Sequence, residues 1–273
     1  MGHHLNDFGQ NKERVKADVS SESQADYTIS TPIMVAADGG SSKIRSIMGL
    51  DFLGLTYPET TILVATKFPF HEHTEGLSNV NYVWSNWGTF SLLRLPNVWR
   101  CSLYPDVEET IDEAIKPESI INKLKRIIPN QTDFKLLEIR PYKIHQRILD
   151  KYDYGRVVFA GDAAHLNSPS GGMGMNGGIH DAWNLSDKIC GIVKDNYPLS
   201  RLSLYSRQRQ KIAQDEILKN TDKNRSRMQN RDKKSRAKEL IRLQNIASTP
   251  DEARKFLLRS SMIEGLKKTE QIT

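Results

Sequence analysis

The stretch Tyr154–Lys188 constrains the fold of this chain more than any other, because it places a strand, a carboxylate, a glycine-rich loop and a helix in direct succession. The apolar run Val157–Ala160 is long enough for a buried strand and too short for a helix. Gly161 and Asp162 follow it and put a carboxylate at the carboxyl end of the strand, where open α/β sheets bind ligands. These residues therefore predict a ligand site at the end of a sheet.

The loop beyond this carboxylate is rich in glycine and leads into a helix. Glycine permits sharp turns and a close approach of the backbone to a ligand. Apolar residues then recur at helical spacing from Ile179 to Ile192, so a helix is predicted to begin at the end of the loop. Its N-terminus offers free N–H groups and a partial positive charge of about half an electron. The sequence thus predicts a site for a polar, partly anionic cofactor. The loop residues are Pro169, Gly171, Gly172, Gly174, Gly177 and Gly178.

The order of identities in this stretch is more specific than a bare glycine loop. Residues 156–165 read RVVFAGDAAH, residues 171–176 read GGMGMN and residues 181–185 read DAWNL. This order resembles the second flavin motif of the FAD-dependent aromatic-hydroxylase family, the single-component flavoprotein monooxygenases. In that family the residue matching Asp162 hydrogen-bonds the ribityl chain of FAD, and the one matching Pro169 lies beside the isoalloxazine ring. The resemblance implies FAD binding by Gly161, Asp162, Pro169, Gly172, Gly174, Met175 and Asn176.

A second motif supports the same resemblance. The apolar run Ile33–Ala37 predicts a buried strand, and residues 38–45 after it read DGGSSKIR. Ser41 or Ser42 is predicted to cap a short helix at 43–48, with the charge of Arg45 free for a phosphate or a carboxylate. The order resembles the first internal fingerprint of the same hydroxylases, whose Asp and Arg organise the pyrophosphate region of FAD and the path of NAD(P)H. It implies cofactor-binding roles for Asp38, Gly39 and Arg45.

The segments around the two motifs predict a mixed α/β (α+β) fold. Two strands at 5–10 and 14–19 form a hairpin, and four short strands between 61 and 104 form a mostly antiparallel sheet with a covering helix at 117–128. The chain is all-helical after residue 198, and Thr249 caps a helix that starts with Pro250. We expect an FAD-binding part at 1–50, a substrate-domain sheet at 51–140, the second half of the FAD-binding domain at 141–196 and C-terminal helices at 197–273.

The aromatic residues of the predicted sheet have two interpretations. In the resembling family such a sheet forms the floor of the substrate pocket, where aromatic rings line a site for a flat substrate. Packing in the core is the commoner fate of aromatic residues on strands. The residues in question are Tyr82, Trp84, Trp87, Phe90 and Trp99.

One part of the family pattern is absent from the sequence. Members normally open with a βαβ unit whose Gly-x-Gly-x-x-Gly loop binds the FAD pyrophosphate, and no such loop occurs here. We therefore expect an incomplete FAD-binding doubly wound domain that corresponds to the later part of a family member. The strands at 33–37 and 157–160 would then lack a neighbour.

Composition and cysteine usage narrow the class of protein. The 273 residues are 38% hydrophobic and 26% charged, ordinary values for a globular chain. No apolar run approaches the length of about 18 residues that a bilayer span needs, and no signal-peptide pattern opens the chain. Cys101 and Cys190 stand in no metal or redox spacing, and we interpret His71 and His73 as surface-loop residues rather than metal ligands. We expect a reduced cytoplasmic protein without a metal site.

The net charge of +6 is concentrated in one segment. Residues 201–240 hold thirteen Lys and Arg against five Asp and Glu, an excess of eight, which leaves about −2 for the rest of the chain. A basic helix can bind nucleic acid or an anionic membrane. A solvated helix face is the commoner interpretation, and no aromatic residues are interleaved to stack on bases. Binding to nucleic acid is therefore not expected.

The resemblance implies an FAD-dependent monooxygenase that uses NAD(P)H and O2 to hydroxylate a phenol-like or other aromatic substrate. The cofactor carries the difficult chemistry, so no catalytic residue of the protein is assigned. Flavin-dependent halogenases, epoxidases and reductases share the two motifs. The alternatives are an inactive fragment, a subunit that needs a separate N-terminal nucleotide-binding chain, or a basic interaction module at 201–240. A homodimer is a further interpretation of the unpaired strands.

Overall fold

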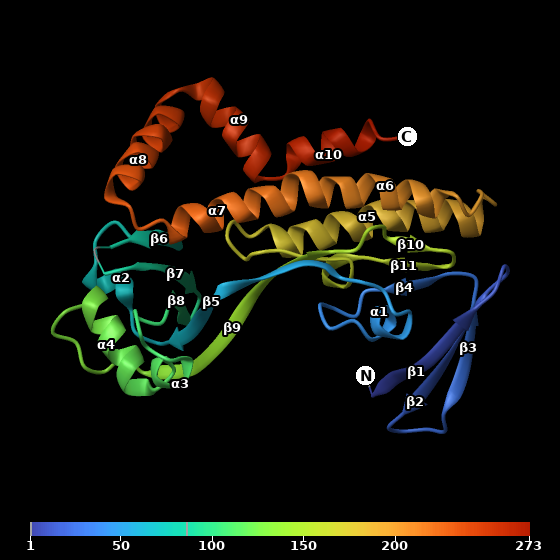
Figure 1. The fold of residues 1–273 in the computed structure, drawn as a ribbon, viewed down its shortest axis with the longest axis horizontal. Helices are drawn as coiled ribbons and strands as arrows, with labels where there is room; N and C mark the ends of the chain where they lie inside the picture. The colour runs from blue at the N-terminus through green and yellow to red at the C-terminus, as the bar shows by residue number, and fades with distance from the viewer. Residues whose placement is uncertain (1, 86) are drawn as a thin grey trace. The chain divides into compact units, whose positions relative to one another are not determined.

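The computed structural model describes residues 2–85 and 87–273 and divides the chain into two units. Unit 1 comprises Met1–Leu55, His145–Asn224 and Arg242–Thr273, and unit 2 comprises Thr56–Ile144 and Arg225–Ile241. Figure 1 labels their helices and strands. The mixed α/β fold with antiparallel sheets and C-terminal helices confirms the predicted fold class.

The centre of unit 1 is a short sheet of order β10-β11-β4. Strands β4 (Met34–Ala36) and β11 (Val157–Phe159) pair in parallel, with Val158 opposite Val35. Strand β10 (Asp153–Tyr154) pairs with β11 on its other side in the antiparallel sense. The three residues of β11 are fully buried, as expected for a parallel strand covered on both faces. Both apolar runs are therefore strands, as predicted, but β11 pairs on both sides, so the expectation that it would lack a neighbour was wrong.

A separate antiparallel sheet of order β1-β2-β3 lies near the N-terminus. Strands β1 (His3–Gln10) and β2 (Val15–Ser21) form the predicted hairpin, and the Asn11 side chain accepts the N–H groups of Glu13 and Arg14 in its turn. Strand β2 alternates buried and exposed residues, so one face packs and the other meets water. Strand β3 (Tyr27–Thr31) was not predicted, although its Tyr, Thr and Ile residues favour a strand.

Long helices follow the central sheet of unit 1 in the chain. Helices α5 (Met173–Lys194) and α6 (Arg201–Ile212) lie side by side (Figure 1). A π-helical segment, Ala213–Leu218, joins α6 to α7 (Lys219–Gln229). Helices α8 (Lys233–Ser248), α9 (Pro250–Ser260) and α10 (Ile263–Glu270) complete the all-helical C-terminal part, as predicted. Helix α9 starts at Pro250, but the Thr249 side chain makes no capping hydrogen bond, so that detail was wrong.

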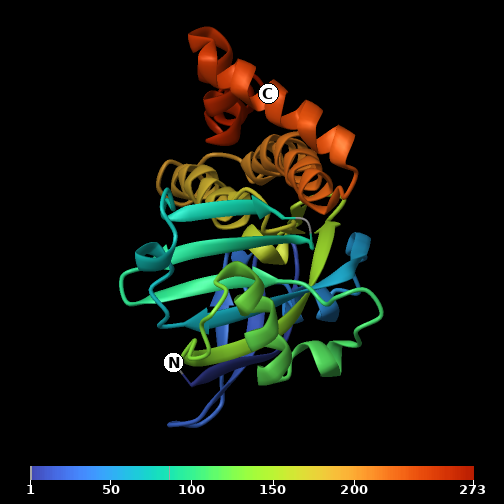
Figure 2. The same ribbon diagram turned by 90° about the vertical axis from the view of Figure 1, so that its left-hand side faces the viewer.

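Most of unit 2 is an antiparallel sheet and the helices that cover it. The sheet has the order β12-β9-β5-β8-β7-β6, and Figure 2 shows its strands edge to edge. Strand β12 and the end of β9 that pairs with it belong to unit 1. Its core is an apolar cluster that includes Ile62, Leu92, Leu103, Ile120 and Leu124. The bounds are β5 (Leu53–Thr66), β6 (Val80–Trp84), β7 (Thr89–Leu95), β8 (Val98–Leu103), β9 (Leu136–Ile148), β12 (His165–Leu166), α2 (Phe70–His73), α3 (Ile111–Ala114) and α4 (Pro117–Ile127).

The aromatic residues of this sheet differ in how far they are exposed to solvent. Phe90 is 5% and Trp99 3% exposed, and both belong to the apolar core. Trp87 stacks on Phe90 with ring centroids 5.2 Å apart. Tyr82 is 54% exposed. Core packing therefore accounts for the two most buried rings, and these rings offer no surface to a substrate.

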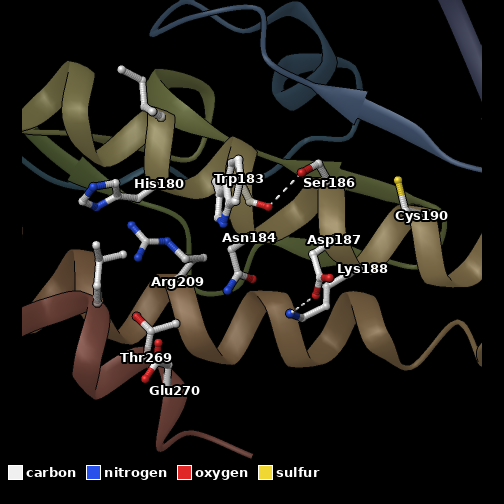
Figure 3. A pocket seen from close by; sticks show the side chains of 12 residues that line it. His180, Trp183, Asn184, Ser186, Asp187, Lys188, Cys190, Arg209, Thr269 and Glu270 are labelled. Atoms are coloured by element: carbon white, nitrogen blue, oxygen red, sulfur yellow. Dashed lines mark hydrogen bonds and ion pairs between the residues drawn. The ribbon is translucent and has the colours of Figure 1, made fainter. Parts of the chain in front are cut away.

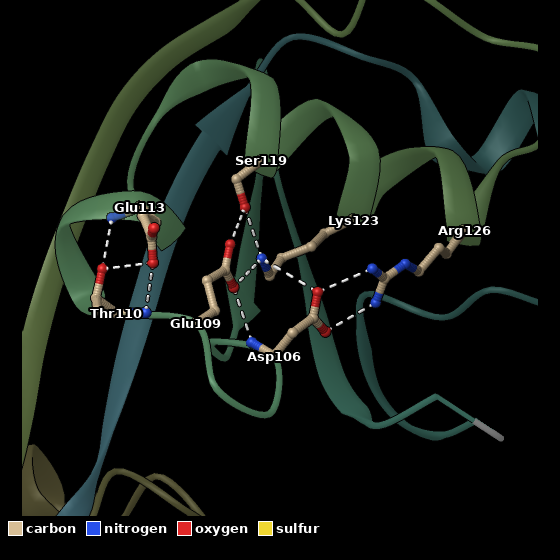
Figure 4. A network of polar contacts seen from close by, with 7 residues as sticks. All are labelled: Asp106, Glu109, Thr110, Glu113, Ser119, Lys123 and Arg126. Atoms are coloured by element: carbon tan, nitrogen blue, oxygen red, sulfur yellow. Dashed lines mark hydrogen bonds and ion pairs between the residues drawn. The ribbon is translucent and has the colours of Figure 1, made fainter.

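A buried ion cluster fixes the loop after β8 to helix α4 (Figure 4). Lys123 is 2% exposed, and its Nζ lies 2.5 Å from Glu109 Oε2 and 3.6 Å from Asp106 Oδ2. Arg126 holds the other side of Asp106 through two hydrogen bonds of 2.8 Å. The charge of Lys123 is thus matched by two carboxylates, which a buried ammonium group requires.

A membrane-spanning helix and a cluster of metal-ligating side chains are two features that the residues described by the structure lack. None of their helices combines the length and the apolar character needed to cross a membrane. No group of three or more His, Cys, Asp or Glu side chains among them is placed to hold a metal ion. His71 and His73 were interpreted as loop residues, but they lie in the short helix α2 and stack on Trp99 and Phe68.

Candidate cofactor site

The two sequence motifs lie beside each other in unit 1 because they follow adjacent parallel strands. The carboxyl ends of parallel strands meet at the same edge of a sheet, and the N–H of Ala160 donates to the carbonyl of Ala36 at 3.0 Å. Arg45 from the first motif also donates through Nη1 to the carbonyl of Ala163 in the second, at 3.1 Å. Segments more than a hundred residues apart in the chain thus form one site.

The first motif is a turn followed by the short helix α1 (Lys43–Ile47). Gly39 has a φ of +83°, a conformation that glycine adopts without strain. Ser42 caps the helix, as predicted, by accepting the N–H of Arg45 at 3.0 Å, and Asp38 Oδ2 accepts the N–H of Ile44 at 3.2 Å. The Asp38 carboxylate therefore helps to form the turn.

Arg45 makes more contacts within the protein than the sequence predicted. Its side chain is 9% exposed, and its guanidinium donates to the carbonyls of Gly40 and Ala163 and lies 3.8 Å from the centroid of the Phe52 ring. Burial, opposed by the charge of Asp38, lowers the pKa of Arg45. Two of its five N–H groups thus make backbone contacts, one of which joins the two motifs. A contact between Arg45 and FAD stays a prediction.

The second motif places the carboxylate of Asp162 at the solvent-exposed surface. Gly161–Ala163 form a single 3₁₀ turn after β11, and Gly161 has a φ of +61°. Asp162 is exposed, and its side chain forms no hydrogen bond or ion pair with another described residue. A Cβ atom on Gly178 of helix α5 would lie 3.3 Å from the Cα of Gly161. The glycines at 161 and 178 therefore let the turn and the helix meet backbone to backbone.

The glycine loop forms a tight turn that ends in helix α5. The N–H of Gly172 donates to the carbonyl of Pro169 at 3.0 Å, and Gly171 and Gly172 have φ angles of +104° and +66°. Helix α5 begins at Met173 with Gly172 at its N-cap. Gly174 and Met175 lie in its first turn, with Met175 76% exposed. The predicted helix is present, but it begins at Met173, so Gly174, Gly177 and Gly178 lie in the helix and not in the loop before it. The Asn176 amide donates to the carbonyl of Gly172 at 2.9 Å.

A buried charged network lies directly behind the turn. Asp181 on α5 is fully buried, and its Oδ2 accepts the N–H of Gly161 at 3.0 Å and lies 2.8 Å from His165 Nε2. Arg209 on α6, also fully buried, donates from Nε to Asp181 Oδ1 at 2.7 Å. Burial by itself raises the pKa of Asp181, but His165 and Arg209 offset it and hold that pKa below its ordinary value.

The role of Asp181 was not predicted from the sequence, although the residue belongs to the second motif. The available signal was a carboxylate between Gly177 and Leu185, both buried, on the inward face of the helix. An unpaired charge there is too costly to persist, so a partner was implied. Which cation supplies it depends on tertiary packing. Arg209 belongs to the basic segment interpreted as a solvated face, and it points inward instead.

A separate cleft of about 800 Å³ lies along helices α5, α6 and α10 (Figure 3). Its lining includes the apolar side chains of Ile179, Trp183 and Leu266, with His180 and Arg209 pointing toward the same end. Burial and the charge of Arg209 lower the pKa of His180. None of the sequence-predicted cofactor residues lines this cleft.

The residues at the two motifs fit a polyhydroxylated ligand with anionic character. The Asp162 carboxylate has no partner among the described residues and suits a sugar-like hydroxyl as its donor. The first turn of α5 supplies N–H groups that no helical carbonyl accepts, together with the positive end of the helix dipole. FAD has both kinds of group in its ribityl chain and its ring. The cradle therefore suits the cofactor that the motifs imply.

Comparisons with known proteins agree with this geometry. Residues 1–221 match the family model described as FAD binding domain. Para-nitrophenol 4-monooxygenase from Pseudomonas sp. (strain WBC-3) is 32% identical over 184 residues, which cover 66% of this chain and 45% of that protein. A 3-(3-hydroxy-phenyl)propionate/3-hydroxycinnamic acid hydroxylase from Burkholderia cenocepacia (strain HI2424) is 29% identical over 211 residues, 73% of this chain and 36% of that protein.

A solved structure extends the similarity to the fold. The crystal structure of p-nitrophenol 4-monooxygenase PnpA from Pseudomonas putida DLL-E4 superposes with a TM-score of 0.86 and 26% identity, covering 97% of this chain and 66% of that one. The chain spans less than half the length of the two relatives above. The match of a flavin family model over most of the chain and the aromatic hydroxylases among its relatives lead to one assignment. The chain belongs to the FAD binding domain family.

Proposed function

We propose that this chain functions in an FAD-dependent monooxygenase that hydroxylates a phenol-like or other aromatic substrate with NAD(P)H and O2. One oxygen atom of O2 enters the substrate as a hydroxyl group, and the other leaves as water with the two electrons of NAD(P)H and a proton. FAD, when bound, supplies the redox chemistry of this reaction. The observation that carries the proposal is the Asp162 carboxylate, which is exposed beside the glycine-rich start of helix α5 and has no partner among residues 2–85 and 87–273.

The residues of the two motifs would divide the work of holding FAD. Asp162 would accept hydroxyl protons of the ribityl chain, and Pro169 would lie beside the ring. The backbone of Gly172, Gly174, Met175 and Asn176 would face the pyrimidine edge, where their N–H groups stabilise negative charge. Gly161, Asp38 and Gly39 would shape the backbone around the cofactor, and Arg45 would hold the two motifs together through its bond to Ala163.

The substrate class rests on the relatives rather than on a pocket. The names of the two relatives state action on para-nitrophenol and on hydroxylated phenylpropionate or cinnamate. Both are phenols, which supports a phenol-like substrate for this chain. The protein's part in the reaction would be to orient the ring of the substrate and to exclude water from the cofactor.

The cofactor proposal is tested by FAD titration of the full chain and of Asp162→Ala. Quenching of flavin fluorescence gives the dissociation constant, and thermal unfolding monitors the fold. We expect the substitution to weaken binding at least tenfold, because the loss of a hydrogen bond to a charged group costs about 1.5–3 kcal/mol. The melting temperature should stay within about 1 °C, since Asp162 is exposed and bonds nothing else among the described residues. Equal affinity in both proteins would refute the role of Asp162.

The activity is tested separately by following NAD(P)H absorbance with FAD and para-nitrophenol present. Oxidation that requires both additions, together with formation of a hydroxylated product, supports the monooxygenase. The control omits O2, which should abolish product formation. Flavin binding without product on any phenol tested would leave a flavoprotein of another reaction type and overturn the hydroxylase proposal.

A further inference from the structure

The buried Asp181 network is not explained by packing alone, because burial of a carboxylate is expensive. Asp181 and Arg209 are both fully buried, and replacement of such pairs by apolar residues is often neutral or stabilising. The buried Asp181 carboxylate is therefore expected to have a role in holding the groups that it contacts in place. Those contacts converge on the turn that carries Asp162.

We infer that Asp181 is a positioning residue that fixes the conformation of the Gly161–Asp162 turn and thereby presents the Asp162 carboxylate to the cofactor. The Oδ2 atom of Asp181 receives the Gly161 N–H at 3.0 Å, the residue directly before Asp162. Gly161 has a φ of +61°, so its backbone needs an external contact to select this conformation among the many that glycine allows. This inference rests on the proposed FAD site.

The other contacts of Asp181 fix the position of its carboxylate beside the Gly161–Asp162 turn. His165 on β12 follows the turn in the chain and lies 2.8 Å from the same Oδ2 atom. Arg209 on α6 holds the other oxygen at 2.7 Å, and its Nη2 lies 3.4 Å from the carbonyl of Gly177 on α5. Tyr152 stacks on His165 with ring planes inclined by 12°. One carboxylate thus connects α5, α6, β12 and the turn.

The two aspartates of the motif therefore divide their roles by exposure. Asp162 is exposed and has no partner among the described residues, as a ligand-binding group requires. Asp181 is buried and fully occupied, so it cannot reach a ligand and acts through the Gly161 N–H. The contact is directional, because a carboxylate accepts that N–H and the isosteric amide of asparagine presents either an oxygen or an NH2 group.

The test substitutes Asp181→Asn in the full chain. The amide oxygen is expected to face Arg209, the strongest donor, which turns the NH2 group toward the Gly161 N–H. We expect the FAD dissociation constant to rise at least tenfold and amide hydrogen exchange of the 160–166 segment in the FAD-free chain to quicken at least tenfold. The exchange of β11 should change less than that of the turn.

Two further variants separate positioning from a general loss of stability. Lys123→Met removes a buried charge of unit 2 that contacts neither the turn nor α5, so it should lower the melting temperature without changing the FAD dissociation constant. Asp181→Glu keeps the negative charge opposite Arg209 but displaces the carboxylate by one methylene group. It should weaken FAD binding severalfold, and it replaces Asp181→Asn in the test if that variant does not fold.

The outcomes distinguish this inference from the proposed function. If Asp181→Asn, or Asp181→Glu in its place, binds FAD within twofold of the unaltered chain, the positioning role is refuted. If the unaltered chain binds no FAD, the proposed function fails, and hydrogen exchange still decides the inference. Faster exchange confined to the turn then supports it, whereas unchanged exchange at 160–166 overturns it.

Discussion

Replacement of Arg209 by methionine is the most direct probe of the charge balance inside unit 1. Arg209→Met keeps much of the side-chain volume and removes the donor that lies 2.7 Å from Asp181 Oδ1. Both side chains are fully buried, so the carboxylate cannot recover the loss from solvent. Breaking a buried pair by removing one partner costs about 3–5 kcal/mol. At about 2–4 °C per kcal/mol for a domain of this size, the melting temperature should fall by roughly 10 °C.

The loss should also depend on pH, and its sign follows from the pKa of Asp181. That pKa is held below its ordinary value in the folded chain, so the carboxylate contributes stability above an ordinary carboxyl pKa of about 4 and loses it as the pH falls. Without Arg209, only His165 opposes the effect of burial, so the pKa of Asp181 should rise and a proton can neutralise the group more easily. The stability gap between the two proteins should therefore be wider at pH 7 than at pH 5.

Urea unfolding followed by circular dichroism at pH 7 and pH 5 measures both effects. Arg207→Met is a matched control, because Arg207 is an exposed residue of the same helix and should change the free energy of unfolding by less than about 0.5 kcal/mol. A loss below about 1 kcal/mol for Arg209→Met at pH 7 would contradict the magnitude. An equal loss at both pH values would contradict the assignment of the penalty to an ionised Asp181.

Two other substitutions test the packing argument. Gly54→Ala should prevent stable folding or cost at least about 3 kcal/mol, because the new Cβ would lie 2.0 Å from the carbonyl oxygen of Gln146, whereas Gly9→Ala has nothing within 4 Å and should be neutral in urea unfolding. Soluble Gly54→Ala with an unchanged midpoint would refute the clash. Lys123→Met should lower the free energy of unfolding by about 2 kcal/mol, the scale of a hydrogen bond to a charged group, and differential scanning calorimetry that finds no loss would show that Glu109 and Asp106 are satisfied without it.

Local sequence patterns predicted the elements of the candidate site well. The runs around Val35 and Val158 have enough apolar residues to define buried strands, and the glycines before Met173 define the start of α5. The fold class follows from these alternations, which depend only on neighbours in the chain. The hairpin and the Ser42 cap were predicted for the same reason.

Contacts between distant segments were beyond the reach of such patterns. The sequence contains Arg209 in a basic segment, and nothing in its neighbourhood states that it pairs with Asp181, 28 residues away. The bond of Arg45 to Ala163 was not predicted, because it joins segments 118 residues apart. Strand β3 is a different case, because its Tyr, Thr and Ile residues are a local strand signal that was not used. The two contacts of Arg209 and Arg45 are cases in which tertiary packing decides.

The contact between Gly161 and Gly178 has a mechanical consequence. A Cβ atom at 178 would lie 3.3 Å from the Cα of Gly161, so the joint between the turn and helix α5 has no flexible side chain to absorb a displacement. Close-packed atoms compress little and transmit strain. A shift of α5 along its axis should therefore displace the backbone of the Gly161–Asp162 turn. Conversely, a ligand that displaces the Asp162 carboxylate should transmit that displacement through the turn to helix α5.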